Sequence, residues 1–290
     1  TLIAWARTAD FLELTKPRIT LMVLVTTLVG FYLGLRGSVP LVLLGHTLLG
    51  TALVASGASA FNMYLERHFD SLMKRTHNRP LPAGRLQAGE ALAFAVTITV
   101  AGGIYLLAFV NVLTSLVAAI TLLSYLFVYT PLKRRTWLCT LVGAVPGGLP
   151  AAMAWTAITG HLSLGAWIVF GIVFFWQLPH FYAIGWIYRE DYARAGYPLL
   201  AVVDSSGSRT SRQSDVYIVL LILVTVMPVM AGLAGFVYLV GALALGIAFL
   251  ACGVWFTRSR DRASARRLFM ASILYLPILL ALLMADKIAP

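Results

Sequence analysis

Three side chains with oxygen atoms that can bind a metal, Asn62, Glu66 and Asp70, follow one another at intervals of four residues. They stand at the end of a long apolar run. A helix turns about 100° per residue, so the three positions stay within about 80° of one another on one helical face. Mg²⁺ prefers oxygen ligands, and the Lys and Arg side chains of the adjoining segment 74–79 suit the oxygens of a diphosphate. The spacing therefore predicts a site for Mg²⁺ and diphosphate at a membrane boundary, for a substrate that is part phosphate and part lipid.

The elements that must hold these side chains are long apolar runs. Of the 290 residues, 60% are hydrophobic and 11% are charged, whereas a soluble domain carries about 25% charged residues. A bilayer core is about 30 Å thick, and the runs long enough to cross it are 19–36, 41–66, 90–110, 112–130, 138–158, 162–182, 216–234, 236–257 and 267–286. We therefore expect an all-α polytopic membrane protein with about nine transmembrane helices around a central cavity, forming a single domain over residues 1–290.

The basic residues gather on one side of these spans. Of the 22 Lys and Arg residues, all except Arg36 and Lys287 fall in the N-terminal segment or in the loops after the second, fourth, sixth and eighth runs. The positive-inside rule puts the N-terminus and these loops in the cytoplasm or its organellar equivalent. The net charge of +11 thus reflects membrane topology, and we expect no nucleic-acid partner.

The acidic residues follow the same distribution, since only Asp286 of the eleven falls on the other side. Two inner loops, 67–89 and 183–215, are long, and each comes directly after an acidic helix end. An active site is therefore expected on the inner face, with these two loops forming its mouth. The stretch around Phe11 and Leu12, with Trp5 and Leu14, is interrupted by acidic residues, so we expect an interfacial helix there rather than a cleavable signal.

A shorter inner loop, 129–136, carries three consecutive cations after a span. Such cations can serve only to fix topology. Beside a phosphate site, however, Lys133 and Arg134 are candidate ligands of phosphate oxygens, and Tyr129 is a candidate hydroxyl donor.

The aromatic stretch 174–182 holds Gln177 and His180 three residues apart, with Trp176 beside them and Pro179 between. A histidine inside a membrane span is often a hydrogen-bonded structural group. The alternative is a contact with an aromatic or iron-bearing substrate, because neutral imidazole binds iron well. The Gly and Pro run 143–150 predicts close helix packing and a kink in the fifth span.

In these motifs the chain resembles the UbiA-type intramembrane prenyltransferases, and most closely their haem-farnesylating branch, the protohaem IX farnesyltransferases (haem O synthases). The segments that carry the resemblance are 15–18, 62–70, 73–82, 129–134, 176–181 and 191–193. One departure is informative: the wider family has a second Asp-x₃-Asp motif, whereas here Asp191 is followed four residues later by Ala195. The haem-farnesylating branch resembles this reduced form, and the number of Mg²⁺ ions stays open.

The resemblance implies transfer of a farnesyl group from farnesyl diphosphate to a vinyl group of haem b, which yields haem O and diphosphate. It implies Mg²⁺ as the cofactor, with Asn62, Glu66, Asp70 and Asp191 as its ligands. Diphosphate would contact Arg75, Arg79, Lys133, Arg134 and Tyr129, and the catalytic set would be the metal ligands with Lys133 and Arg134. Haem would contact His180, Gln177, Trp176, Lys16, Arg18 and Arg212.

The resemblance also implies a place in the cell: a bacterial plasma membrane or a mitochondrial inner membrane, with the site facing the cytoplasm or matrix. Haem-copper oxidase assembly or a haem A synthase would use the product. The alternatives are a UbiA-type prenyltransferase that acts on an aromatic quinone precursor, a solute transporter, and a haem-binding electron carrier. The absent second carboxylate argues against a quinone-precursor prenyltransferase. Polar groups gathered at one face argue against a transporter, and a single histidine deep in a span argues against an electron carrier.

Overall fold

The structure, a computed structural model, describes residues 2–288, with side chains described from Arg7 onward. Within this described part, nine helical spans are long and apolar enough to cross a membrane. They are α2 (Pro17–Gly34), α3 (Leu41–Asp70), α4 (Ala88–Phe109), α5 (Val112–Leu123) continued by η1 (Ser124–Tyr129) and α6 (Thr130–Leu132), α7 (Cys139–Thr159), α8 (Leu164–Ile187), α11 (Ser208–Met230), α12 (Phe236–Ser259) and α13 (Arg262–Ala285). The expected all-α membrane fold with nine spans is confirmed, while the inward N-terminus stays a prediction.

Helices α3 and α11 extend well beyond the apolar runs at their polar ends. Helix α3 continues through Asp70, so Asn62, Glu66 and Asp70 share one uninterrupted helix. Helix α11 begins at Ser208, where the carboxylate of Asp204 accepts a hydrogen bond from Thr210 N at 2.8 Å. Such capping satisfies free N–H groups of a first turn, which explains why a polar segment joins the helix.

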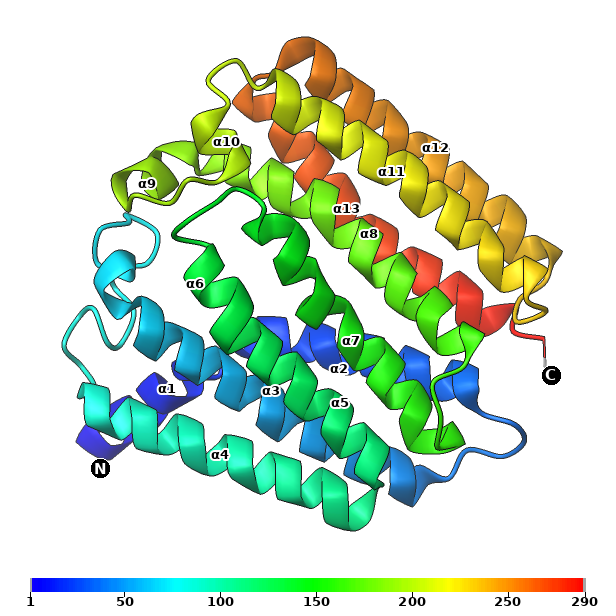
Figure 1. The fold of residues 1–290 in the computed structure, drawn as a ribbon, viewed down its shortest axis with the longest axis horizontal. Helices are drawn as coiled ribbons and strands as arrows, with labels where there is room; N and C mark the ends of the chain where they lie inside the picture. Colours follow the sequence, from blue (N-terminus) through cyan, green and yellow to red (C-terminus); the bar gives the residue numbers. More distant parts are fainter. Residues whose placement is uncertain (1, 289–290) are drawn as a thin grey trace.

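The helices lie side by side, and the polar connections gather at one end of the bundle (Figure 1). The short helices α9 (Arg189–Arg194) and α10 (Leu200–Val203) lie at this end, beside the connection between α3 and α4. Helix α1 (Leu2–Leu14) lies there too, whereas α13 ends at the opposite end. The two long loops expected at the mouth of a site therefore meet at one end.

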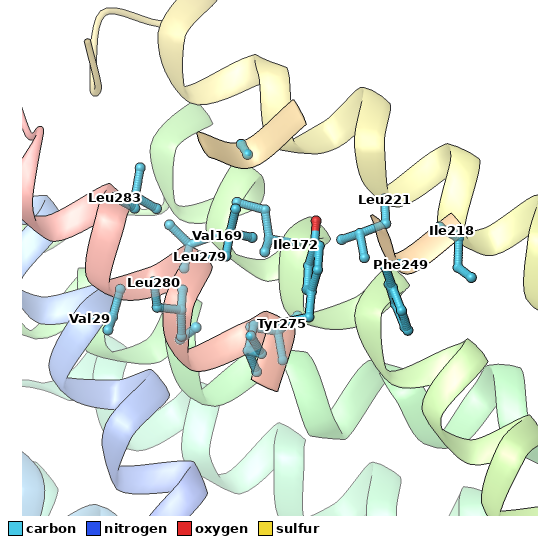
Figure 2. Close-up of a cluster of buried hydrophobic side chains, with 14 of the residues drawn as sticks. Val29, Val169, Ile172, Ile218, Leu221, Phe249, Tyr275, Leu279, Leu280 and Leu283 are labelled. Carbon is cyan, nitrogen blue, oxygen red and sulfur yellow. The ribbon is translucent and has the colours of Figure 1, made fainter. Parts of the chain in front are cut away.

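The largest cluster of buried apolar side chains joins α8, α11, α12 and α13 (Figure 2). Ile172, Ile218 and Leu279 are fully buried in it, and the Phe249 ring packs at a tilt against Tyr275 with ring centroids 5.0 Å apart. In a bilayer, association of helices rests on such packing, because lipid tails are as apolar as the side chains. This cluster makes the second half of the bundle a rigid support for α8.

Helix α1 lies against the inner ends of α3 and α4. Leu14 is fully buried, with Phe11 packed beside it, whereas Leu12 is 59% exposed. Arg85, from the α3–α4 connection, holds the helix in place through ion pairs to Asp10 at 2.7 Å and Glu13 at 2.9 Å. The side chain of Trp5 lies outside the described residues, and the interfacial position of the helix stays a prediction.

Asp286 and Lys287, which lie on the opposite side of the spans from most charged residues, cap helix ends. Lys287 Nζ donates to the carbonyls of Tyr32 and Leu35, each at 2.7 Å, at the end of α2. The Asp286 carboxylate accepts from Tyr238 N at 2.7 Å, in the first turn of α12. Both charges thus satisfy backbone groups that a helix end leaves unpaired.

The α2–α7 contact depends on a glycine. A Cβ on Gly30 would lie 2.1 Å from the carbonyl oxygen of Ala151, a distance that real side chains do not reach. We predict that Gly30→Ala lowers the free energy of unfolding by about 1–3 kcal/mol, because the two backbones must move apart. The thermal unfolding midpoint of the detergent-purified protein measures this. Gly103→Ala in α4 is the matched control, since a Cβ there meets nothing within 4 Å; equal midpoints for both variants would contradict the close contact.

Candidate active site

Asn62, Glu66 and Asp70 form a strip of oxygen atoms along the C-terminal end of α3, here called the oxygen strip. All three are buried, with 3%, 3% and 1% of their surface exposed. Four residues of helix rise about 6 Å, so Asn62 and Asp70 are about 12 Å apart along the axis. Two short side chains and one ion with bonds of about 2.1 Å do not cover that distance. The strip therefore presents its ligands along a line rather than around one ion.

Each member of the oxygen strip contacts its own cation. Lys16 Nζ donates to Asn62 Oδ1 at 2.6 Å. Lys133 Nζ lies 3.0 and 3.1 Å from the two carboxylate oxygens of Glu66, and Arg79 Nη1 lies 2.7 Å from Asp70 Oδ2. The cations come from three chain segments that are far apart in sequence. Buried carboxylates require such partners, since an unpaired buried charge costs several kcal/mol (about 3–5).

Lys16 reaches the strip from an unusual backbone conformation. It precedes Pro17 at the start of α2 with φ 48° and ψ 65°, in the left-handed region. A residue other than glycine costs about 1–3 kcal/mol there and persists where the surroundings require it. Burial, with the nearby charge of Arg79, lowers the pKa of Lys16 to about 7. An anion bound beside this amine would favour its protonated form.

The helix type changes just before Lys133, and this change positions the residue. Ser124–Tyr129 form a π-helix, and Pro131 follows it. Proline has no N–H and its ring crowds the carbonyl four residues earlier, which favours a widened turn. Burial alone would lower the pKa of Lys133, but the facing carboxylate of Glu66 raises it well above its ordinary value. Lys133 is therefore a permanent cation in this site.

Tyr129 lies beside this segment, and its ring stacks on Tyr125 with centroids 5.3 Å apart. It occupies space that a glycine leaves open: a Cβ on Gly143 would lie 2.5 Å from the ring. The close packing expected of the run 143–150 is thereby confirmed. The structure shows no hydrogen bond for the Tyr129 hydroxyl within the described residues, so its role as a donor stays a prediction.

An aromatic layer lies under the cations and joins the two long inner loops. Lys133 Nζ lies 4.6 Å from the ring centroid of Tyr197, and the Tyr197 ring lies 5.3 Å from that of Phe69. Met73 from the first loop packs with Tyr192 and Tyr197 from the second. The Tyr197 hydroxyl is buried with no hydrogen-bond partner in the described structure, and burial raises the pKa of this phenol. It is thus a neutral donor without an acceptor.

The other predicted diphosphate ligands lie around this layer. The Arg75 guanidinium lies 5.4 Å from the Tyr188 ring centroid, and Arg75 Nη2 is 3.5 Å from the Tyr192 hydroxyl. Arg134 donates to the Leu65 carbonyl at 2.9 Å and is exposed. Both side chains are held by weak or backbone contacts rather than by a carboxylate, so their charges are free to meet an anion.

Asp191 is paired with Arg194 of the same short helix at 3.0 Å. Within the described residues, no three His, Cys, Asp or Glu side chains lie close enough together to hold a metal ion. The role of Asp191 as a metal ligand stays a prediction.

The oxygen strip fits Mg²⁺ that arrives with a diphosphate. Its donors are carboxylate and amide oxygens, and Asp70 Oδ1 is buried without a hydrogen-bond partner among the described residues. Mg²⁺ commonly takes one or two carboxylates and completes its shell with water and substrate phosphates. Two carboxylates and an amide in a line therefore suffice when phosphate oxygens supply the remaining ligands.

The predicted haem contacts lie mainly on α8. Gln177 Nε2 donates to the carbonyls of Val173 at 3.0 Å and Ala144 at 3.3 Å. Trp176 Nε1 donates to the Ser272 carbonyl at 2.8 Å, and His180 Nδ1 lies 2.7 Å from the Ser272 hydroxyl. The Nε2 group of Gln177 is thus already hydrogen-bonded to two backbone carbonyls.

The three basic residues predicted to contact haem are placed differently. Lys16 belongs to the oxygen strip through Asn62. Arg18 and Arg212 are exposed, and neither has a hydrogen bond or ion pair within the described part of the chain. Their role toward haem propionates stays a prediction.

Two buried residues of this region have no counterpart among the sequence predictions. Tyr197 follows Gly196, whose φ of 72° ends the turn after α9; the run Gly196-Tyr197-Pro198 is the signal that would have marked it. Ser272 lies within an apolar span where a serine carries no signal of its partner.

An apolar crevice of about 320 Å³ lies between α3, α4 and the α5–η1 span, with Tyr64, Leu65, Val96 and Leu126 among its lining residues. Its lining includes Leu65, the residue before Glu66 on α3, but none of the three residues of the oxygen strip. The central cavity expected from the sequence stays a prediction.

Comparison with known proteins gives a consistent family. Residues 23–276 match the model of the UbiA prenyltransferase family. The chain is 46% identical over 287 residues to a protein named protoheme IX farnesyltransferase from Solibacter usitatus, covering 96% of this chain and 98% of the relative. Proteins of the same name from Salinibacter ruber (45% identity, 96% and 98% covered) and Myxococcus xanthus (42%, 97% and 95%) are also similar.

Two solved structures share the fold. A digeranylgeranylglyceryl phosphate synthase superposes with a TM-score of 0.81 at 15% identity, covering 97% of this chain and 98% of the other. A UbiA homologue from Archaeoglobus fulgidus, bound to GPP and Mg²⁺, gives a TM-score of 0.67 at 15% identity, covering 94% and 99%. At this identity the likeness concerns the fold.

The Lys133–Glu66 pair generates a prediction about stability. Lys133→Met leaves a carboxylate that is 3% exposed without its partner, and we expect a loss of about 3–5 kcal/mol in the free energy of unfolding. The double variant Lys133→Met with Glu66→Gln should recover most of that loss, because no unpaired buried charge remains. Thermal unfolding midpoints of the purified variants measure both effects. A double variant as unstable as Lys133→Met would show that packing, not charge pairing, is responsible.

Proposed function

Because this chain belongs to the UbiA prenyltransferase family, we propose that it transfers a farnesyl group from farnesyl diphosphate to a vinyl group of haem b, forming haem O and releasing diphosphate. The full-length relatives at 40–46% identity are named for this activity. The structural observation that carries the proposal is the oxygen strip with one cation on each member.

The reaction requires a diphosphate to leave from an allylic carbon. The bond between that carbon and the diphosphate oxygen breaks, and the vinyl group of haem forms a bond to the carbon. Water then adds to the resulting cation and loses a proton, which gives a hydroxyethylfarnesyl side chain. Positive groups placed at the leaving diphosphate lower the barrier, because they stabilise charge that develops in the transition state.

The cations of the site supply that stabilisation. Lys133, Arg79 and Lys16 each touch an oxygen of the strip and lie within a side-chain rotation of a diphosphate bound along it. We propose that they turn to phosphate oxygens when substrate binds, and that Arg75 and Arg134 add charge from the rim. The buried Tyr197 hydroxyl, which lacks an acceptor, is a further donor for a phosphate oxygen.

Magnesium completes this arrangement. A fold neighbour binds Mg²⁺ with a prenyl diphosphate, which supports metal-dependent transfer in the family. For this chain we propose Asn62, Glu66 and Asp70 as ligands of Mg²⁺, with no single ion contacting all three, and with Asp191 joining them on substrate binding. When bound, the metal would polarise the phosphate oxygens and help diphosphate to leave.

Haem is favoured over a quinone precursor as the acceptor. Ala195 stands where a second carboxylate would follow Asp191, and the full-length relatives carry the haem name. A transporter is less consistent with the geometry, since the strip lies in the last turns of α3 (Leu41–Asp70) rather than at the middle of a span.

The nine spans make this an integral membrane protein. We propose the bacterial plasma membrane as its location, because the similar relatives are bacterial, with the oxygen strip facing the cytoplasm. The charge distribution supports that side. Haem-copper oxidase assembly or a haem A synthase is proposed as the consumer of haem O.

A product assay tests the function directly. The purified protein in detergent is incubated with haem b, farnesyl diphosphate and Mg²⁺, and the extracted haem is weighed by mass spectrometry. We expect a haem heavier by one farnesyl group and one hydroxyl group, absent after chelation with EDTA and restored by added Mg²⁺. Unchanged haem with a folded protein would direct the search to aromatic acceptors. Product formation in the presence of EDTA would contradict the proposed role of Mg²⁺.

Asp70→Asn separates the charge of the strip from its shape. Asparagine keeps an oxygen for Arg79 but loses the negative charge, so we expect turnover to fall by about 100-fold or more, as for loss of a metal ligand or its support. Asp10→Asn is the matched control, because Asp10 is also paired with an arginine on the inner surface. Near-normal turnover of Asp70→Asn in the mass assay would remove the proposed metal role of this residue.

A further inference from the structure

His180 stands in an aromatic environment between α8 and α13. Its ring stacks on Trp176 with centroids 5.0 Å apart and an angle of 28°. The Phe269 ring lies 5.0 Å away on α13, and the Phe181 ring meets it edge-on at 5.7 Å. Aromatic side chains thus surround the imidazole, and its two ring nitrogens are the polar atoms that it presents.

Ser272 fixes which nitrogen of His180 carries the proton. The Ser272 hydroxyl lies 2.6 Å from the Phe269 carbonyl, which can only accept, so the hydroxyl donates its single proton there. The same oxygen lies 2.7 Å from His180 Nδ1 and must therefore accept. Nδ1 then carries the proton, and Nε2 presents a lone pair.

Nothing in the described structure uses that lone pair. Nε2 has no hydrogen-bond partner among residues 7–288, and it is absent from the polar atoms that are both unpaired and fully enclosed. Ser272 by contrast is completely buried. The imidazole is thus anchored at one nitrogen and open at the other, which is the usual arrangement of a histidine that binds a metal.

We propose that His180 Nε2 ligates the iron of haem and that Ser272 is the positioning residue that holds it in the required tautomer. The inference rests on the proposed function, since haem is the acceptor there. It adds the ligating atom, and it assigns a role to a serine that belongs to no motif of this chain.

The surroundings favour haem over a merely structural histidine. A neutral imidazole is the common protein ligand of haem iron, and a hydrogen bond to its other nitrogen raises its basicity. The flanking rings of Trp176, Phe181 and Phe269 offer apolar surface to a porphyrin.

The depth of His180 is also suitable. It lies seven residues before the end of α8 at Ile187, about 10 Å along the axis from the inner end. Asn62 lies eight residues before the end of α3, so His180 is about as far from its helix end as the deepest member of the oxygen strip.

Ser272 supports the neighbouring aromatic group as well. Trp176 Nε1 donates to the backbone carbonyl of Ser272 at 2.8 Å, not to its hydroxyl. A change of the hydroxyl therefore leaves the Trp176 anchor in place. This separation allows the tautomer to be tested without dismantling the aromatic environment.

Haem titration monitored by absorption tests the proposal. Ferric haem b is added to the detergent-purified full chain and the Soret band is recorded, with farnesyl diphosphate binding measured in parallel. We expect His180→Ala to lose the wild-type Soret position, with partial recovery on addition of free imidazole, and to keep its affinity for farnesyl diphosphate. Ser272→Ala should weaken haem binding by about 10-fold or more, and Ser272→Thr should retain it, because its hydroxyl makes the same two contacts. His161→Ala at the other end of the spans is the control.

The outcomes separate this inference from the proposed function. An unchanged Soret band in His180→Ala, or equal losses of haem and farnesyl diphosphate affinity, overturns the ligand assignment while product formation still stands. Wild-type haem affinity in Ser272→Ala overturns the positioning role. If the wild-type protein makes no haem product, the proposed function itself fails.

Discussion

The end of the bundle that carries the oxygen strip depends on one electrostatic constraint: charges buried in a membrane protein must be paired. Glu66 and Asp70 are almost fully buried on α3, and neither carboxylate would be tolerated there alone. Lys133 and Arg79 meet them, and Lys16 meets the neighbouring amide of Asn62. Because the cations come from the start of α2, the α3–α4 loop and the α6–α7 connection, the pairing draws three distant segments around one helix face.

Packing elsewhere keeps that arrangement in register. Small residues let α2 approach α7, and α7 in turn makes room for Tyr129 and Gln177 at Gly143 and Gly147. Both neighbours belong to the predicted site, so the Gly and Pro run shapes the site although it contributes no functional group. The apolar cluster of α8, α11, α12 and α13 gives α8 a firm support (Figure 2), so the aromatic stretch around His180 is held by the half of the bundle that lacks the oxygen strip.

The sequence predicts the spans and the strip well because both are local. Apolar length identifies a span, and a spacing of four residues places side chains on one face whatever surrounds the helix. Partnerships across the chain are not local. Lys16 was expected at haem but contacts Asn62, 46 residues away in sequence, and no spacing rule links the two. Ser272 and Tyr197 were missed for the same reason: a serine in an apolar span and a tyrosine after a turn acquire meaning only through neighbours that the fold supplies.

The charges of the strip also give a physical reason why the proposed Mg²⁺ and diphosphate would bind there only together. A metal ion alone would meet Lys16, Lys133 and Arg79, whose positive charges oppose it. A diphosphate alone would meet the carboxylates of Glu66 and Asp70. When both are present, the metal can take the strip oxygens while the released cations take the phosphate oxygens, so that every buried charge exchanges one partner for another. The pairing that stabilises the buried charges would thus favour a substrate that carries its own cation, as the proposed lipid diphosphate with Mg²⁺ does.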